Sequence, residues 1–136
     1  MNIVEFDRVI EAPVDVVWSL VNSAAGLNQW MSVEATVDLT PGGTIRWVHD
    51  NGWVVAGQVR EIVPMRRLVF TYGWEHGGFP VPVGSSVVTL EMEALGSSTR
   101  ISVRHDGLTP EMAAQHQLGW TMFIERLAHC AEGVTA

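Results

Sequence analysis

The feature that most constrains this chain is its last third, where a short strand pattern leads directly into one long helical pattern. Residues 99–105 alternate between apolar and polar side chains, as a strand requires, and Asp106-Gly107 then turns the chain. Pro110 suits the first position of a helix. One helix face is then formed at spacings of three and four by Met112, His116, Gly119, Trp120, Phe123, Leu127 and Cys130. The pattern predicts a continuous helix from about Pro110 to Ala131, long enough to cross a whole small sheet.

The stretch between residue 32 and residue 107 is predicted to consist of strands. Turn sequences separate its alternating segments, above all Pro41-Gly42-Gly43 and Asn51-Gly52. Together with a first strand at residues 2–11, the predicted strands are residues 33–39, 44–49, 53–63, 68–74, 86–95 and 99–105. Two short helices are predicted at residues 14–22 and 24–31, and a long mobile loop at residues 73–86.

These elements predict an α+β fold within one domain, residues 1–136. We expect an antiparallel seven-stranded sheet curved around the long C-terminal helix. The two short helices after the first strand would close one end. Because a curved sheet wrapped around one helix leaves a hollow between them, the content of that hollow bears on function.

The composition argues against several classes of function. A formal net charge of −7 disfavours nucleic acid as a partner. No apolar run approaches the roughly 18 residues that a membrane span needs, and the acidic first residues do not suggest a signal peptide. The single cysteine, Cys130, fits a reducing cytoplasm, which is the expected location. The hydrophobic fraction of 47% is best explained by a cavity with apolar walls.

Alternation places several large side chains on the sheet face that is expected to meet the long helix. These are Trp47 and His49 on one strand, Phe70, Tyr72 and Trp74 on another, and Met92 on a third. Each large aromatic side chain buries on the order of 150–250 Å², and its polar tip needs a partner. Such residues are typical of a cavity wall that binds a small molecule. Ordinary core packing is the alternative, and the sequence supports both about equally.

Three histidines, His49, His105 and His116, also fall on apolar faces. Each could be a buried histidine whose hydrogen bonds are satisfied within the core. The alternative is that at least two converge, because His105 ends the last strand and the long helix runs back beside it. His116 and Trp120 are four residues apart and therefore share a helix face. A histidine over an apolar pocket could donate a hydrogen bond to a ligand or act as a general base.

Other chemistry finds little support in the sequence. Cys130 lies on the apolar side of the helix, and the neighbouring His129 points about 100° away, which does not suit a nucleophile and its base. A metal site needs three clustered ligands, and Glu75-His76 together with His49 or His105 is only a weak candidate. No metal and no cofactor is therefore expected.

Two further features stand apart from the expected hollow. Arg8 interrupts the apolar face of the first strand, and we interpret it as reaching solvent or pairing with a carboxylate such as Glu11. The alternative is a cation that meets an acidic ligand group at one end of the cavity. Leu118 and Met122 lie on a second stripe of the long helix, which hints at another contact surface.

Several motifs in this order carry a family resemblance. They are Ile10 to Trp18 with Leu27 to Trp30, Pro41 to Thr44, Gly57 to Leu68, Thr99-Arg100, His105 to Leu108, and His116 to Trp120 leading to Leu127. Together they resemble the START-like, Bet v 1-like superfamily with its helix-grip fold. The best match is the branch named after the activator of Hsp90 ATPase, also labelled polyketide cyclase-like. Members of this superfamily bind lipids, hormones or polyketides, cyclise or hydrolyse, or act as helper proteins, so the resemblance implies a fold more than a function.

The expected function is non-covalent binding of a small hydrophobic or amphipathic molecule between sheet and helix. The predicted ligand-binding residues are Trp47, His49, Phe70, Tyr72, Trp74, Met92, His105, His116, Trp120 and Phe123. One alternative is a cyclase- or hydrolase-type enzyme in which His116 or His105 acts as general base. Another is a helper protein that works through its outer surface. The chain could also form a homodimer.

Overall fold

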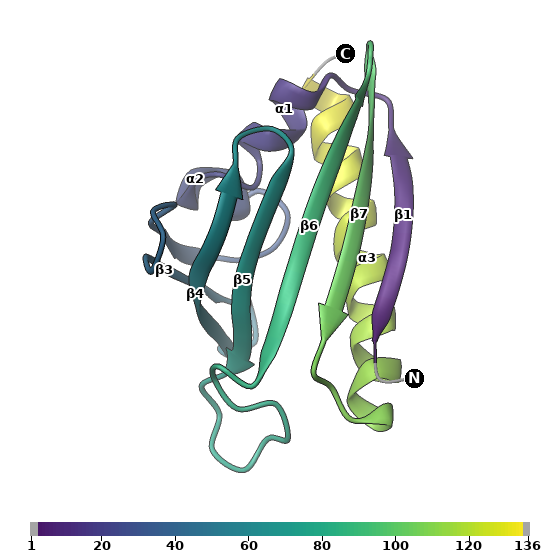
Figure 1. Ribbon diagram of the computed structural model, residues 1–136. Helices are drawn as coiled ribbons and strands as arrows, with labels where there is room; N and C mark the ends of the chain where they lie inside the picture. Colours follow the sequence, from purple (N-terminus) through teal and green to yellow (C-terminus); the bar gives the residue numbers. More distant parts are fainter. Residues whose placement is uncertain (1–2, 135–136) are drawn as a thin grey trace.

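The computed structural model describes residues 3–134. In chain order the elements are β1 Val4–Ile10, α1 Val14–Ser19, α2 Ala24–Leu27, β2 Glu34–Val37, β3 Thr44–Val48, β4 Val54–Val63, β5 Arg67–Trp74, β6 Ser86–Leu95, β7 Ser98–Asp106 and α3 Pro110–Val134. The strands form one antiparallel sheet in the order β1-β7-β6-β5-β4-β3-β2. This sheet curves around α3, which lies behind β7 and β1 (Figure 1). The predicted α+β fold, with seven strands and a long C-terminal helix, is confirmed.

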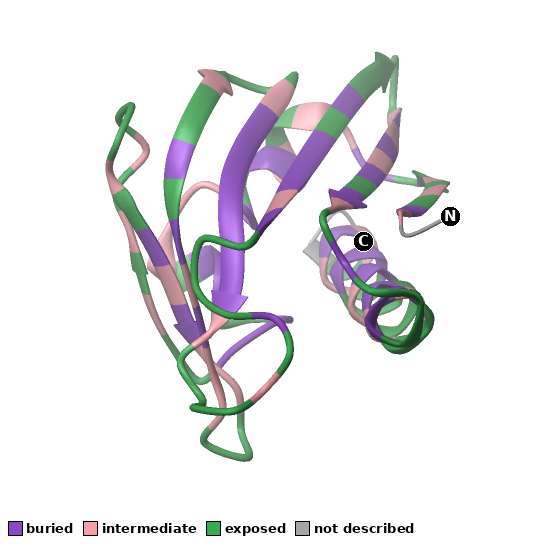
Figure 2. Cartoon of the chain, turned by 60° about the horizontal axis from the view of Figure 1, so that its bottom comes forward, coloured by how far each residue is buried: buried purple, intermediate pink, exposed green. Residues whose placement is uncertain are grey.

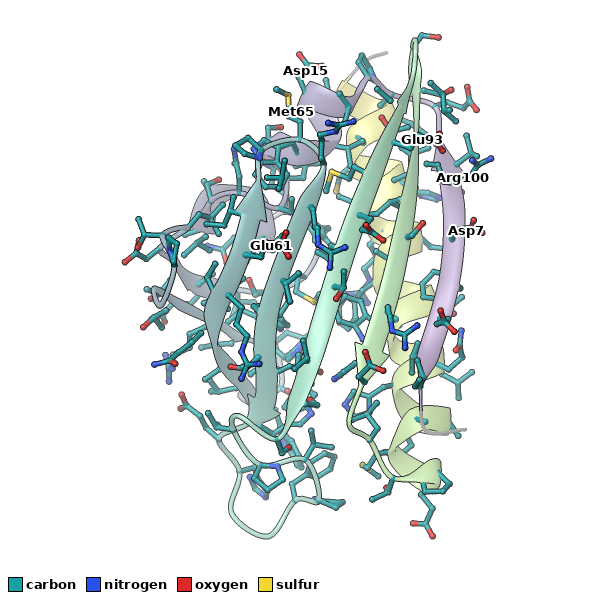
Figure 3. All side chains as sticks on the ribbon, in the orientation of Figure 1. Asp7, Asp15, Glu61, Met65, Glu93 and Arg100 are labelled. Carbon is teal, nitrogen blue, oxygen red and sulfur yellow. The ribbon has the colours of Figure 1, made fainter. Side chains whose placement is uncertain are left out.

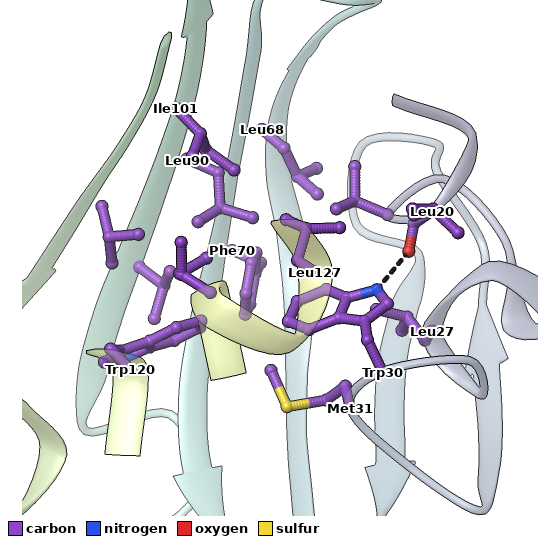
Figure 4. Close-up of a cluster of buried hydrophobic side chains, with 14 of the residues drawn as sticks. Leu20, Leu27, Trp30, Met31, Leu68, Phe70, Leu90, Ile101, Trp120 and Leu127 are labelled. Carbon is purple, nitrogen blue, oxygen red and sulfur yellow. Dashed lines mark hydrogen bonds between the residues drawn. The ribbon is translucent and has the colours of Figure 1, made fainter. Parts of the chain in front are cut away.

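The predicted strands agree with the structure to within two residues at each end, apart from residue 2, which lies outside the described residues. The short helices differ more, because α1 ends at Ser19 and α2 at Leu27. After α2 a tight turn on the carbonyl group of Leu27 leaves the helical path. That turn directs Trp30 inward, where its Nε1 donates a hydrogen bond to the carbonyl oxygen of Leu20 at 2.7 Å (Figure 4). A tertiary contact therefore ends the second helix early.

Close backbone contacts shape the curved part of the sheet. A Cβ on Gly57 would lie 1.7 Å from the carbonyl oxygen of Thr71, and one on Gly73 would lie 2.0 Å from that of Pro82. Only glycine fits at both positions. The pairing of β4 with β5 also shifts register between Val59 and Glu61, and such bulges bend a strand and increase its twist.

The buried face of α3 is rotated slightly from the predicted stripe. Its buried residues are Met112, Ala113, His116, Trp120, Ile124, Leu127, Ala128 and Ala131. Phe123 and Cys130, which we predicted on this face, are only half-buried because the buried line runs through Ile124 and Ala128 instead. The view along α3 shows its buried side turned toward the sheet and its exposed side toward solvent (Figure 2).

The outer face of the sheet is charged and forms ion pairs across neighbouring strands. Arg100 of β7 pairs with Glu93 of β6 and Asp7 of β1 (Figure 3). Arg67 pairs with Glu61 and with Glu91 of β6. Exposed pairs of this kind contribute little to stability, so the energetics of the fold depend on the opposite face.

The predicted loop between β5 and β6 is present, and the middle of the loop is hydrogen-bonded to the last residue of β5. Val81 is 1% exposed. The N–H of Trp74 donates a hydrogen bond to the carbonyl oxygen of Val81 at 2.8 Å, and Trp74 forms an isolated β-bridge with Pro82. The loop therefore folds back over the end of β5, and Figure 1 shows it below the ends of β5 and β6.

Candidate functional site

A hollow of about 440 Å³ lies between α3 and the ends of β3 and β5. Its walls are mostly aromatic, with a smaller polar group at the rim. The lining residues are Met31, Trp47, His49, Asp50, Asn51, Trp53, Tyr72, Trp74, Phe79, Gln115, His116, Gly119, Trp120, Met122, Phe123 and Arg126. A volume of this size is within the range of small-molecule sites.

Three tryptophan–histidine pairs organise these walls. In each pair the indole Nε1–H donates a hydrogen bond to an imidazole nitrogen: Trp47 to His49 at 3.1 Å, Trp74 to His116 at 3.2 Å, and Trp120 to His105 at 3.1 Å. Since an indole N–H can only donate, each imidazole must accept, and each of the three histidines is therefore neutral.

The remaining contacts fix the tautomer of His105. Its Nδ1 accepts from Trp120, so its Nε2 carries the hydrogen and donates to Ser86 Oγ at 2.9 Å. Ser86 Oγ in turn donates to the carbonyl oxygen of Tyr72 at 2.7 Å. His105 is 0% exposed, and both of its nitrogens are used within the protein.

His116 takes the opposite tautomer. Its Nδ1 lies 2.7 Å from the carbonyl oxygen of Met112, which can only accept, so Nδ1 carries the hydrogen. Its Nε2 receives the hydrogen bond from Trp74. In His49 the Nε2 accepts from Trp47, which leaves an Nδ1–H donor with no partner in the described part of the chain.

Burial agrees with these neutral states. Desolvation lowers the pKa of His105 to about 3, with a smaller contribution from the nearby His116. Desolvation also lowers the pKa of His116, and the hydrogen bond that His116 Nδ1–H donates to the Met112 carbonyl oxygen partly opposes this shift. Desolvation likewise lowers the pKa of His49. The rings of His105 and His116 lie 5.4 Å apart, so the two histidines converge in space.

Tyr72 lies at the centre of this arrangement, and its hydroxyl group is unpartnered. The side chain is 4% exposed, and its ring contacts those of His105, His116 and Trp120 at 4.3, 5.7 and 6.3 Å. The hydroxyl makes no hydrogen bond within residues 3–134. Among these residues every fully shielded side-chain nitrogen or oxygen has a partner, so the hydroxyl is open to the hollow that Tyr72 lines. Burial raises its pKa, which keeps it protonated.

Seven of the ten predicted ligand-binding residues line the hollow: Trp47, His49, Tyr72, Trp74, His116, Trp120 and Phe123. Phe70, Met92 and His105 do not. Phe70 and Met92 lie deeper in the hydrophobic core. His105 is hydrogen-bonded behind Tyr72 and Trp120. Whether the seven residues bind a ligand remains a prediction.

Sequence reasoning missed the residues that reach the hollow from loops, from the turn after α2 or from the rim of α3. These are Met31, Asp50, Asn51, Trp53, Phe79, Gln115, Gly119, Met122 and Arg126. Gly119 had a signal, because a glycine beside His116 and Trp120 on one helix face leaves room for a close approach. Nothing in the local pattern marks Phe79, whose position depends on how the loop folds back.

Other candidates from the sequence have structural partners. Arg8 pairs with Glu125 and Glu132 of α3, so a carboxylate neutralises it as interpreted, although Glu11 is not the partner. Glu75 binds Arg46, and His76 stacks on Trp53 at 4.1 Å. Within residues 3–134 no group of three or more His, Cys, Asp or Glu side chains is arranged to hold a metal ion.

Residues 11–132 match the family described as activator of Hsp90 ATPase homolog 1-like protein. The chain belongs to this activator of Hsp90 ATPase homolog 1-like family. The predicted resemblance is thus confirmed. No curated protein matches the sequence. Among the described residues no helix is long and apolar enough to cross a membrane.

Solved structures similar to this member of the activator of Hsp90 ATPase homolog 1-like family share its fold along nearly its whole length. Protein MLL2253 from Mesorhizobium loti has a TM-score of 0.85 at 20% identity, covering 96% of this chain and 97% of that one. DynU16, a protein of the dynemicin biosynthetic locus, has a TM-score of 0.84 at 25% identity, covering 97% of this chain and 48% of DynU16. The Aha1 dimer from Colwellia psychrerythraea has a TM-score of 0.82 at 17% identity, covering 97% of each chain.

Proposed function

We propose that this protein binds a small hydrophobic or amphipathic molecule, without covalent chemistry, in the hollow between the sheet and α3. The observation that carries the proposal is the Tyr72 hydroxyl. It is a polar group in an otherwise buried side chain that faces an aromatic hollow without a partner. Leaving a buried polar group unsatisfied is costly, and a ligand oxygen would satisfy it. The Nδ1–H of His49, on the same wall, is a second donor that has no partner among the described residues.

The same geometry argues against an imidazole general base. A general base needs a free lone pair near the proton that it removes. In His105, His116 and His49 the only basic nitrogen already accepts an indole N–H. An enzyme that used one of them would first have to break a tryptophan–histidine hydrogen bond. A surface helper function would not require an open aromatic hollow, whereas binding does.

Gly119 offers a direct test, because it lines the hollow and a Cβ added to it meets no atom within 4 Å. A Gly119→Phe side chain would fill the space, and replacing a helical glycine with phenylalanine should raise helix stability by a few tenths of a kcal/mol. The neutral fluorescent probe N-phenyl-1-naphthylamine should bind the wild type and lose at least tenfold in affinity in Gly119→Phe. Fluorescence titration measures both.

Gly133→Phe is the matched control, since Gly133 also lies on α3 with open space around its Cβ and does not line the hollow. It should leave probe affinity unchanged. Equal affinities in all three proteins would contradict the proposal. Native mass spectrometry of the purified wild type should identify any co-purifying compound, which Gly119→Phe should lack.

Three other predictions remain proposals beside this one: one domain over residues 1–136, a cytoplasmic location and a homodimer. The location depends only on the single Cys130. For the homodimer, Leu118 and Met122 are 75% and 47% exposed on α3, and the similar protein from Colwellia psychrerythraea is described as a dimer. Equilibrium sedimentation of the wild type and Leu118→Gln tests it, because a dimer that uses this stripe should dissociate more readily in the variant.

A further inference from the structure

A second hollow, of about 350 Å³, adjoins the first across a shared wall. The residues that border both hollows are Met31, His49, Asp50, Phe123 and Arg126. Asp50 and Arg126 are exposed, so the two hollows meet at the protein surface. The second hollow is the more polar in its side chains, which include Asn28, Gln29 and His129.

Arg126 lies on this shared wall without a carboxylate partner. Five other arginines, Arg8, Arg46, Arg67, Arg100 and Arg104, each lie within 4.0 Å of an acidic group. Within the described residues Arg126 forms no ion pair and no hydrogen bond. Its guanidinium carbon lies 5.1 Å from the centre of the Phe123 ring. Stacking of this kind holds the planar guanidinium in place and leaves its N–H edge available.

We propose that the natural ligand is an elongated molecule with an aromatic or apolar body and one acidic end group, and that Arg126 binds the acidic group. The body would occupy the first hollow, so this inference rests on the proposed function. The acidic end would lie at the junction and extend into the second hollow. A planar guanidinium suits a carboxylate because it can donate two parallel hydrogen bonds.

The net charge of the whole chain supports the assignment of Arg126 as the group that binds the acidic end. At a net charge of −7 the chain as a whole repels an anion, and Asp50 adds a negative charge to the same rim. Within residues 3–134 Arg60 and Arg66 also form no ion pair, but they border neither hollow. Favourable binding of an anion therefore requires a local cation, and among the residues that border both hollows Arg126 is the only arginine.

Two probes with the same aromatic body test the assignment: neutral N-phenyl-1-naphthylamine and 8-anilinonaphthalene-1-sulfonate, which adds one anionic group. We expect Arg126→Gln to lower the affinity for the anionic probe about threefold to tenfold and to leave the affinity for the neutral probe unchanged. Asp50→Asn should raise the affinity for the anionic probe, because it removes a negative charge from the rim. Gln29 is exposed and lines the second hollow, so Gln29→Trp would place a large ring there. This variant should also lower the affinity for the anionic probe only. The effect of Arg126→Gln should shrink as salt is added.

The matched control is Arg60→Gln, which removes the same charge from an exposed position away from both hollows and should alter neither probe. If the neutral probe binds and Arg126→Gln does not affect the anionic one, the acidic-ligand assignment is wrong while the proposed function stands. If neither probe binds the folded wild type, the proposed function itself fails. Equal weakening by Arg60→Gln and Arg126→Gln would show a general charge effect and would overturn the role of Arg126.

Discussion

The two ends of the space between sheet and helix are built on the same strands and the same helix, yet one is filled and the other is open. At the filled end, aliphatic side chains such as Leu68, Leu90, Ile101 and Leu127 interlock (Figure 4). Where the two ends meet, a pocket of only about 10 Å³ remains. At the open end about 440 Å³ remains.

The difference follows from the side chains. Branched aliphatic groups adapt to one another and pack to crystal-like density. Aromatic rings are flat and stiff, and several of those at the open end meet edge to face, with Trp74 6.1 Å from Tyr72 and Trp53 5.1 Å from Phe79. The indole–imidazole hydrogen bonds then hold the rings in place. The comparison teaches that a hollow can persist beside a dense core when its walls are tied to each other.

The largest expected effect comes from a deletion at the filled end. Leu127 is 0% exposed, so Leu127→Ala should leave a cavity and lower the free energy of unfolding by about 2–5 kcal/mol. Phe123→Ala at the open end should cost clearly less, because the half-buried ring already borders a hollow. Urea denaturation of both variants measures the difference. Equal losses would mean that the open end is packed as tightly as the filled one.

A smaller effect is expected from cutting one indole–imidazole bond. Trp120→Phe removes the donor to His105 Nδ1 and leaves that nitrogen buried without a partner, at a cost of about 1–3 kcal/mol. Trp53→Phe is the control, because the Trp53 indole N–H has no hydrogen-bond partner within residues 3–134 and the side chain is only half-buried. If both variants unfold at the same urea concentration, the hydrogen bond does not support the wall.

The pH dependence of stability should show the smallest effect. His105 has a folded pKa of about 3 against an ordinary value of 6.5, so below pH 6.5 the unfolded chain binds a proton that the folded chain does not. Stability is then complete above about pH 6.5 and falls progressively toward pH 3, by about 1 to 1.5 kcal/mol at pH 5.5. His105→Gln should flatten this slope relative to the wild type in urea denaturation from pH 5 to 8. Parallel slopes would show that His105 takes up a proton in the folded state.

Much of the site could be predicted from the sequence because the faces of strands and helices are local properties. Alternation put Trp47, Tyr72 and Trp74 on the inner face of the sheet, and helical spacing put His116 and Trp120 on one side of α3. The same reasoning placed Phe70 and His105 on the correct face but could not give their depth. Depth depends on where the sheet bends, and that is set by the close contacts of Gly57 with Thr71 of β5 and of Gly73 with Pro82 in the loop between β5 and β6.

By itself, the sequence determined the succession of strands along the chain, the long helix and the inward faces of both. A period of two residues, or of three to four, fixes which side chains point together. Only the tertiary structure decided which partners meet. Trp74 and His116 are 42 residues apart. Arg126 of α3 stands at the junction of two hollows, which are lined by α3, by β3 and β5, and by the segments that follow α2 and β3. Such contacts depend on the curvature of the sheet and on the docking of α3. Those follow from packing the whole chain, and no local period encodes them.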